Sequence, residues 1–127
     1  MASNSSFFVY FTCTATLDDA EKLLRDSGLV VNREAEVIEV SWGEGPKLWI
    51  GLSTEPHVKL EALEVSELKG VPELAQCDRR FEVGFDDLDE VLDETNGLAV
   101  TQLALQDLTH GWITMAWNGN IMRPEGR

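Results

Sequence analysis

The N-terminal part of the chain shows a strand pattern followed by a helix pattern. Residues 7–14 are rich in aromatic side chains and threonine and are apolar on both faces, which predicts a strand inside a sheet. Apolar residues at helical spacing follow, namely Leu17, Ala20, Leu23 and Leu24. Thr16 stands three residues before Asp19, and Gly28 follows the last turn. The pattern predicts a helix that begins with a capping box and ends at a glycine.

Three further segments have the composition of strands, at residues 29–33, 36–42 and 47–53. Turn-forming residues separate them, in the stretches 32–35 and 43–46. Because such short links join antiparallel neighbours, we expect these segments to form a meander of three strands.

The middle of the chain, residues 54–78, predicts little regular structure. Pro56, Gly70 and Pro72 interrupt any long element, because proline removes a helical hydrogen bond and glycine favours turns. A short helix is the most that we expect in this segment.

Regular patterns resume at residue 80. Residues 80–85 alternate between polar and apolar side chains, which predicts a half-buried strand with Arg80 and Glu82 on its outer face. Residues 87–110 have helical apolar spacing, although Gly97 within them predicts a break, a kink or a restart.

The C-terminal residues predict a hairpin. His110 and Gly111 are typical of a helix end. Residues 112–117 predict a strand, and Asn118-Gly119 has the composition of a type I′ turn into a short returning strand at 120–122.

The elements therefore occur in the order strand, helix, three strands, an irregular stretch, strand, helix, strand and a short strand. Each helix must bury its apolar stripe, and the sheet offers the only large partner surface. We expect an α+β fold in which two helices pack on one face of a mostly antiparallel sheet, with the ferredoxin-like arrangement as its nearest relative.

Length and composition place these elements in a single domain. The 127 residues, 43% of them hydrophobic, suffice for one core. We expect residues 1–6 and 124–127 to be frayed ends. A chain of this length folds without a disulfide between Cys13 and Cys77, which favours a reducing, cytoplasmic setting.

The charge is strongly negative. The chain has 23 Asp and Glu residues against 10 Lys and Arg, a net charge of -13. Such a charge disfavours nucleic acid and anionic membranes and favours a basic protein partner. The uncharged run at 108–122 contains too many polar and glycine residues for a membrane span, so we expect a soluble protein.

No motif predicts catalysis or a bound metal ion or cofactor. Neither His57 nor His110 has a cysteine at the short spacing of a zinc site. The glycines in 43–46 are followed by a proline, which lacks the N–H group that a phosphate loop needs. The acidic run at 86–94 has apolar residues at two positions where a calcium loop needs a ligand and a glycine. We expect no catalytic residue, metal or cofactor.

Six clustered carboxylates form the first candidate surface for partner binding: Asp86, Asp87, Asp89, Glu90, Asp93 and Glu94. One interpretation is a solvated helix start, where carboxylates favour the positive end of the helix dipole. The other is a landing surface that speeds encounter with a basic protein and weakens as salt is added.

Four aromatic residues form the second candidate surface: Phe8, Tyr10, Trp49 and Trp112. If the apolar residues beside Trp49 face the helices, alternation turns Trp49 away from them, and the same argument applies to the other three. Either residues 54–78 fold over these aromatics, or the aromatics form an exposed interface patch.

The last third of the chain resembles a known family. Phe81 to Met122 hold a strand, an acidic segment, a helix ending in Thr109-His110-Gly111 and a strand running into Trp117-Asn118-Gly119-Asn120. This succession resembles the immunity proteins of the bacterial swarming-inhibition toxin systems. The resemblance implies a small protein that neutralises a toxin by binding it, and it assigns no catalytic residue.

Three hypotheses for function follow. The first is a non-enzymatic acidic protein-binding domain, an immunity protein for a basic toxin, in which residues 86–94 steer the partner and aromatics anchor it. The second is a homodimeric structural domain in which Phe8, Tyr10 and Trp49 meet across a two-fold axis. The third is an enzyme or small-molecule binder with a pocket between the sheet and residues 54–78.

Overall fold

The computed structural model describes residues 6–42, 47–85, 95–117 and 119–124. Its strands are β1 (Ser6–Phe11), β2 (Val30–Glu34), β3 (Val37–Ser41), β4 (Lys47–Ser53), β5 (Arg79–Phe85), β6 (Trp112–Met115) and β7 (Ile121–Met122). Its helices are α1 (Leu17–Asp26), α2 (Pro56–Lys69) and α4 (Thr95–Thr109), with a short 3-10 helix η1 (Pro72–Gln76). The predicted turn at 43–46, the acidic run at 86–94 and Asn118 of the predicted hairpin turn lie outside the described residues.

The strands of the described segments form one sheet in the order β2-β3-β4-β5-β1-β6-β7. Every neighbouring pair is antiparallel. The α+β class, the antiparallel sheet and the β2-β3-β4 meander are therefore confirmed. β1 lies inside the sheet between β5 and β6, as its two apolar faces predict.

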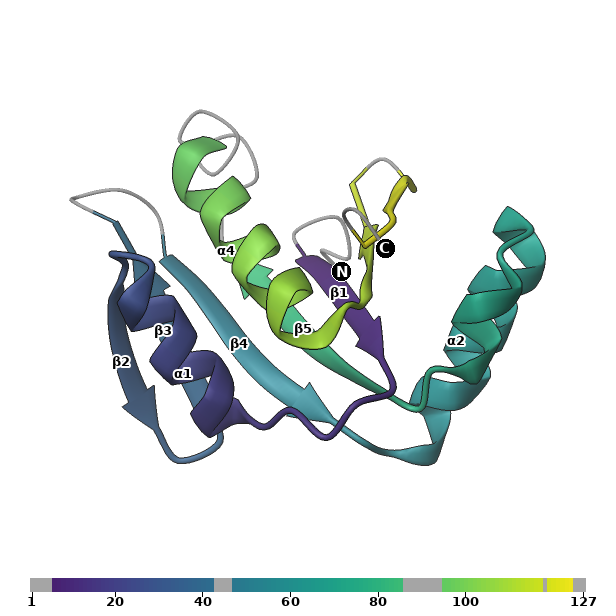
Figure 1. Cartoon of the computed structure of the whole chain (residues 1–127), viewed down its shortest axis with the longest axis horizontal. Coiled ribbons are helices and arrows are strands. Elements are labelled where there is room, and N and C mark those ends of the chain that lie inside the picture. Colours follow the sequence, from purple (N-terminus) through teal and green to yellow (C-terminus); the bar gives the residue numbers. More distant parts are fainter. Residues whose placement is uncertain (1–5, 43–46, 86–94, 118, 125–127) are drawn as a thin grey trace.

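One face of the sheet is covered by α1 and α4, which cross in front of the strands in Figure 1. Their shared core takes alternate residues from the strands: Phe7, Val9, Phe11, Ile38, Val40, Leu48, Ile50, Phe81, Val83, Phe85 and Ile113. α1 begins with the predicted capping box, in which the Asp19 N–H donates to Thr16 Oγ1 over 3.2 Å and the Thr16 N–H donates to Asp19 Oδ2 over 3.0 Å. It ends before Gly28, which has a left-handed φ of 91°.

A third helix of the described segments, α2, packs on the opposite face, so the expectation of two helices on one face is too few. Its core with η1 and the sheet consists of Tyr10, Val58, Ala62, Leu74 and Cys77. Pro56 is the first residue of α2, where a missing N–H costs no helical hydrogen bond, and Gly70 ends the helix with a left-handed φ of 68°. Two of the three residues interpreted as breakers in 54–78 thus mark the ends of a 14-residue helix, and the third, Pro72, begins η1.

The last helix, α4, begins at Thr95 and ends where the sequence predicts. His110 follows it with a positive φ of 53°, and Gly111 leads directly into β6. Gly97 lies in the first turn of α4, and the residues before Thr95 in the predicted helical stretch lie outside the described residues. In the described ranges, no helix is both long enough and apolar enough to cross a membrane.

Candidate functional site

The second face of the sheet carries a buried cation, Arg80, where α2 meets the strands. The Arg80 side chain is only 6% exposed. Its Nη1 donates to Glu61 Oε1 of α2 over 2.6 Å and to the Tyr10 hydroxyl over 2.9 Å, and its Nε donates to Glu82 Oε2 over 2.7 Å. One guanidinium group therefore joins α2, β1 and β5.

The surroundings of Arg80 keep it charged. The Arg80 guanidinium carbon lies 4.0 Å from the centroid of the Phe8 ring, and Arg80 Nη2 lies 3.4 Å from His57 Nε2. Burial alone would lower the pKa of Arg80, but the hydrogen bonds to Glu61 and Glu82 outweigh it and raise the pKa above its ordinary value. Burial also raises the pKa of the Tyr10 hydroxyl, which therefore stays protonated at neutral pH.

This arrangement defines a clamp, the Arg80 clamp, made of Arg80, Tyr10, Glu61 and Glu82. Both carboxylates are directed at one cation, and the Tyr10 hydroxyl accepts from the same group. Because the polar atoms bind one another, we interpret the clamp as the device that holds α2 on the sheet.

Cys77 lies beneath α2 in the same cluster as Tyr10 of the clamp, and its thiol makes the stability of the fold dependent on pH. Burial, with a smaller effect of Asp78, raises the pKa of the Cys77 thiol to about 11, whereas the thiol of the unfolded chain ionises near 9. The folded state thus retains a proton that the unfolded state loses, so stability is full below pH 9 and declines as the pH rises through 11. We expect the free energy of unfolding to fall by roughly 1 kcal/mol between pH 8 and pH 10.

Urea unfolding at these two pH values, compared with Cys77→Ala, measures this contribution. The variant lacks the thiol and should lose less stability over the same interval. An equal loss in both proteins would contradict the assignment to Cys77.

The other half of the second face forms an open groove, the Trp49 groove. The strand register places Trp49 of β4 between Glu39 of β3 and Gly84 of β5, with Asn32 of β2 next in the same row. The groove has a volume of about 350 Å³, and its lining residues are Asn32, Arg33, Glu34, Val37, Glu39 and Trp49. In Figure 1, α2 stands at the far end of the sheet from β2 and β3.

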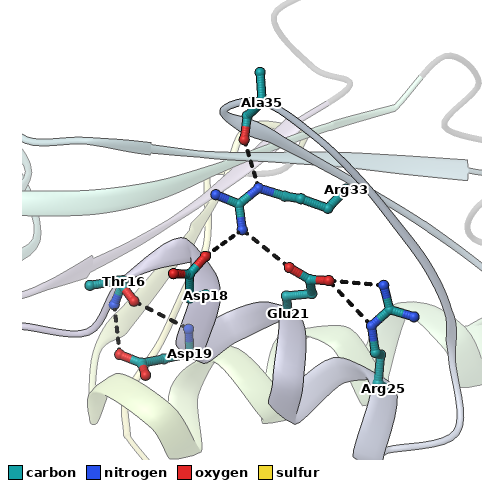
Figure 2. A network of polar contacts seen from close by, with 7 residues as sticks. All are labelled: Thr16, Asp18, Asp19, Glu21, Arg25, Arg33 and Ala35. Atoms are coloured by element: carbon teal, nitrogen blue, oxygen red, sulfur yellow. Dashed lines mark hydrogen bonds and ion pairs between the residues drawn. The ribbon is translucent and has the colours of Figure 1, made fainter.

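The charge of Arg33 is directed away from this groove. Figure 2 shows that its guanidinium turns toward α1, where Nη1 contacts Asp18 Oδ1 at 2.8 Å and Glu21 Oε1 at 3.2 Å. Its Nε donates to the Ala35 carbonyl over 2.7 Å. The hydrogen bond to Asp18, partly opposed by desolvation, raises the pKa of Arg33. Arg33 therefore links the β2-β3 turn to α1. Its positive charge does not neutralise the carboxylates that line the groove.

Two carboxylates give the groove its electrostatic character. Glu34 has no ion-pair partner among the described residues. Glu39 pairs with Lys47, whose Nζ lies 2.9 Å from Oε2. A groove lined by an aromatic ring and two carboxylates, one of them without an ion-pair partner among the described residues, is suited to a cationic group.

The structure describes the four aromatic residues predicted for partner binding, and it places Trp49 apart from the other three. The six carboxylates at 86–94 lie outside the described residues. Tyr10 is 2% exposed beneath α2, so it is not available as an interface residue and the homodimer hypothesis loses one of its three contacts. Phe8 and Trp112 are half-buried and pack against the cluster that Tyr10 forms with residues of α2 and η1. Trp49 belongs to neither core cluster and stays partly exposed.

Local sequence patterns do not single out several residues of the Arg80 clamp and the Trp49 groove. Arg80 is on the predicted outer face of its strand, but α2 covers it, and Glu61 lies in a segment where no long helix was expected. Glu34 and Glu39 lie on the same face as Trp49 by simple alternation along an antiparallel meander. That alternation is sufficient to predict that the two carboxylates share a face with Trp49, whereas the Arg80 clamp depends on contacts between distant segments.

A comparison with protein-family models, curated proteins and solved structures found no significant match to this chain. Across the ranges that the structure describes, no three His, Cys, Asp or Glu side chains are grouped so that they could hold a metal ion.

Proposed function

We propose that this chain is a non-enzymatic, cytoplasmic protein-binding domain whose partner is a basic protein. The observation that carries the proposal is the Trp49 groove, which a partly exposed tryptophan lines together with Glu34 and Glu39 on a part of the second sheet face where none of the described helices packs. The C-terminal resemblance implies that the partner is a toxin and that the chain acts as its immunity protein.

The chemistry of the groove fits protein recognition. Tryptophan is enriched among the few residues that supply most of the binding energy, because its large ring is desolvated in the complex. Carboxylates around such an anchor pair with Lys and Arg of the partner, and a net charge of -13 speeds the encounter with a basic surface.

Capture on the immobilised full chain, followed by titration of the purified captured protein, tests this proposal. We expect a basic protein that binds one to one, with a dissociation constant that rises as salt is added. Trp49→Thr, which keeps a strand-favouring residue, should weaken binding by about 30-fold, as expected for the loss of roughly 2 kcal/mol at an anchor.

Leu68→Ala is the matched control, because Leu68 is 81% exposed on α2, away from the groove. It should leave the affinity unchanged. A partner with an acidic surface, or equal affinities for Trp49→Thr and the unaltered chain, would overturn the proposal.

A further inference from the structure

We propose that the Trp49 groove is a receptor for a single arginine side chain, presented by an extended basic segment of the partner. This inference rests on the proposed function and specifies its recognition chemistry. The guest is the guanidinium group of arginine, held by the Trp49 ring and by the carboxylates of Glu34 and Glu39.

The row of residues around Trp49 leaves space for such a guest. Gly84 lies directly across from Trp49 on β5, and a Cβ atom added to Gly84 would meet no atom within 4 Å. A volume of about 350 Å³ is at the small end of the range for ligand sites, roughly 300–1,000 Å³, and suits one long side chain better than a cofactor.

The groove offers both kinds of contact that arginine favours. A guanidinium group stacks on an aromatic ring, and its fork of N–H donors binds a carboxylate through two hydrogen bonds. Glu34 lacks an ion-pair partner within the described part of the chain, and Glu39 can accept from a second cation besides Lys47. Lysine offers a compact charge without a planar surface, so it should bind more weakly.

The same face of the sheet already holds one arginine in this way. The Arg80 guanidinium lies over the Phe8 ring and contacts the carboxylates of Glu61 and Glu82. The Trp49 groove repeats this set of one ring and two carboxylates, but the arginine that lines it, Arg33, is directed to the other face. The groove thus has the composition of an arginine site, and its guest must come from outside the described residues.

An NMR titration with N-acetyl-arginine methylamide, a single-residue probe, tests the inference on the full chain. We expect the indole N–H resonance of Trp49, assigned with a Trp49→Phe spectrum, to shift with a dissociation constant in the millimolar range. The citrulline analogue, which has the same shape without the charge, should bind at least 10-fold more weakly.

Variants of the groove sharpen this test. Glu34→Gln should weaken the arginine probe by 5-fold or more, whereas Glu64→Gln on the exposed surface of α2 should leave it unchanged. Gly84→Arg places a guanidinium group of the chain itself beside Trp49, and should prevent binding of the probe while the chain stays folded.

The outcomes separate the two proposals. The arginine site is wrong if the citrulline and arginine probes bind equally well, or if Glu34→Gln leaves the affinity for the arginine probe unchanged. If a basic partner binds through Trp49 but the probe does not, the arginine site is wrong and the proposed function stands. If the probe binds but no basic protein does, the arginine site stands and the proposed function is wrong.

Discussion

Replacing Arg80 by methionine is expected to lower the free energy of unfolding by about 3 kcal/mol. Methionine fills much of the same space but leaves the buried Tyr10 hydroxyl without its donor and the carboxylates of Glu61 and Glu82 without a shared cation. These carboxyl side chains are 44% and 38% exposed, so water can solvate them in part. The loss should therefore be near the lower end of the range, about 3–5 kcal/mol, for breaking a buried ion pair.

Urea unfolding measures this loss, and hydrogen exchange shows where it occurs. Because the clamp joins α2 to β1 and β5, amides of α2 should exchange much faster in Arg80→Met, while those of α1 should change little. Arg25→Met is the control, since Arg25 forms an exposed pair with Glu21 on α1 that is worth at most about 0.5 kcal/mol. Similar losses of unfolding free energy in the two variants, without faster exchange in α2, would contradict the claim that the Arg80 clamp holds α2 on the sheet.

The parts of the fold that the sequence predicts well are those decided by neighbouring residues. The capping box of Thr16 and Asp19 and the stop at Gly28 are local geometry, and both are confirmed. The prediction of little regular structure at 54–78 was wrong for the same reason. Proline and glycine interrupt a helix when they lie inside it but favour its ends, and Pro56 and Gly70 lie at the two ends of α2. The ferredoxin-like relationship stays a prediction.

The sequence of α2 also lacks a clear apolar stripe, so its packing on the sheet could not be predicted. Val58 and Ala62 are buried against the sheet, but Leu60 and Leu68 on other sides of the helix are 64% and 81% exposed. Apolar residues on several sides give no single direction in which to pack a helix. The sequence therefore did not indicate that α2 would cover the second face of the sheet.

The sequence predicts only part of the candidate site, because local patterns do not show which distant segments pack together. Alternation along β4 correctly predicts that Trp49 faces away from α1 and α4. It does not indicate which of the four aromatic residues is buried against α2. That choice follows from the position of β1, which lies between β5 and β6 and so brings Tyr10 next to Arg80. Pairing of strands so distant in sequence is not visible in local patterns.

Gly111→Ala is expected to lower the free energy of unfolding by about 2–4 kcal/mol, because the chain passes close to β1 where α4 turns into β6. An added Cβ atom would lie 2.5 Å from the Tyr10 carbonyl oxygen, 2.8 Å from Thr109 Oγ1 and 3.0 Å from a methyl group of Val9. A backbone carbonyl in the middle of a sheet cannot move as a side-chain end can. Relief therefore requires β1 or the end of α4 to shift.

Gly84→Ala provides the matched control for this prediction, because both substitutions add one methyl group to a glycine without a positive φ. Gly84 faces open space on the second face of the sheet, so the variant should match or exceed the stability of the unaltered chain by up to about 1 kcal/mol. Thermal or urea unfolding of the two variants side by side measures the difference. Equal stability of Gly111→Ala and Gly84→Ala would contradict the close approach of the chain at Gly111 to β1.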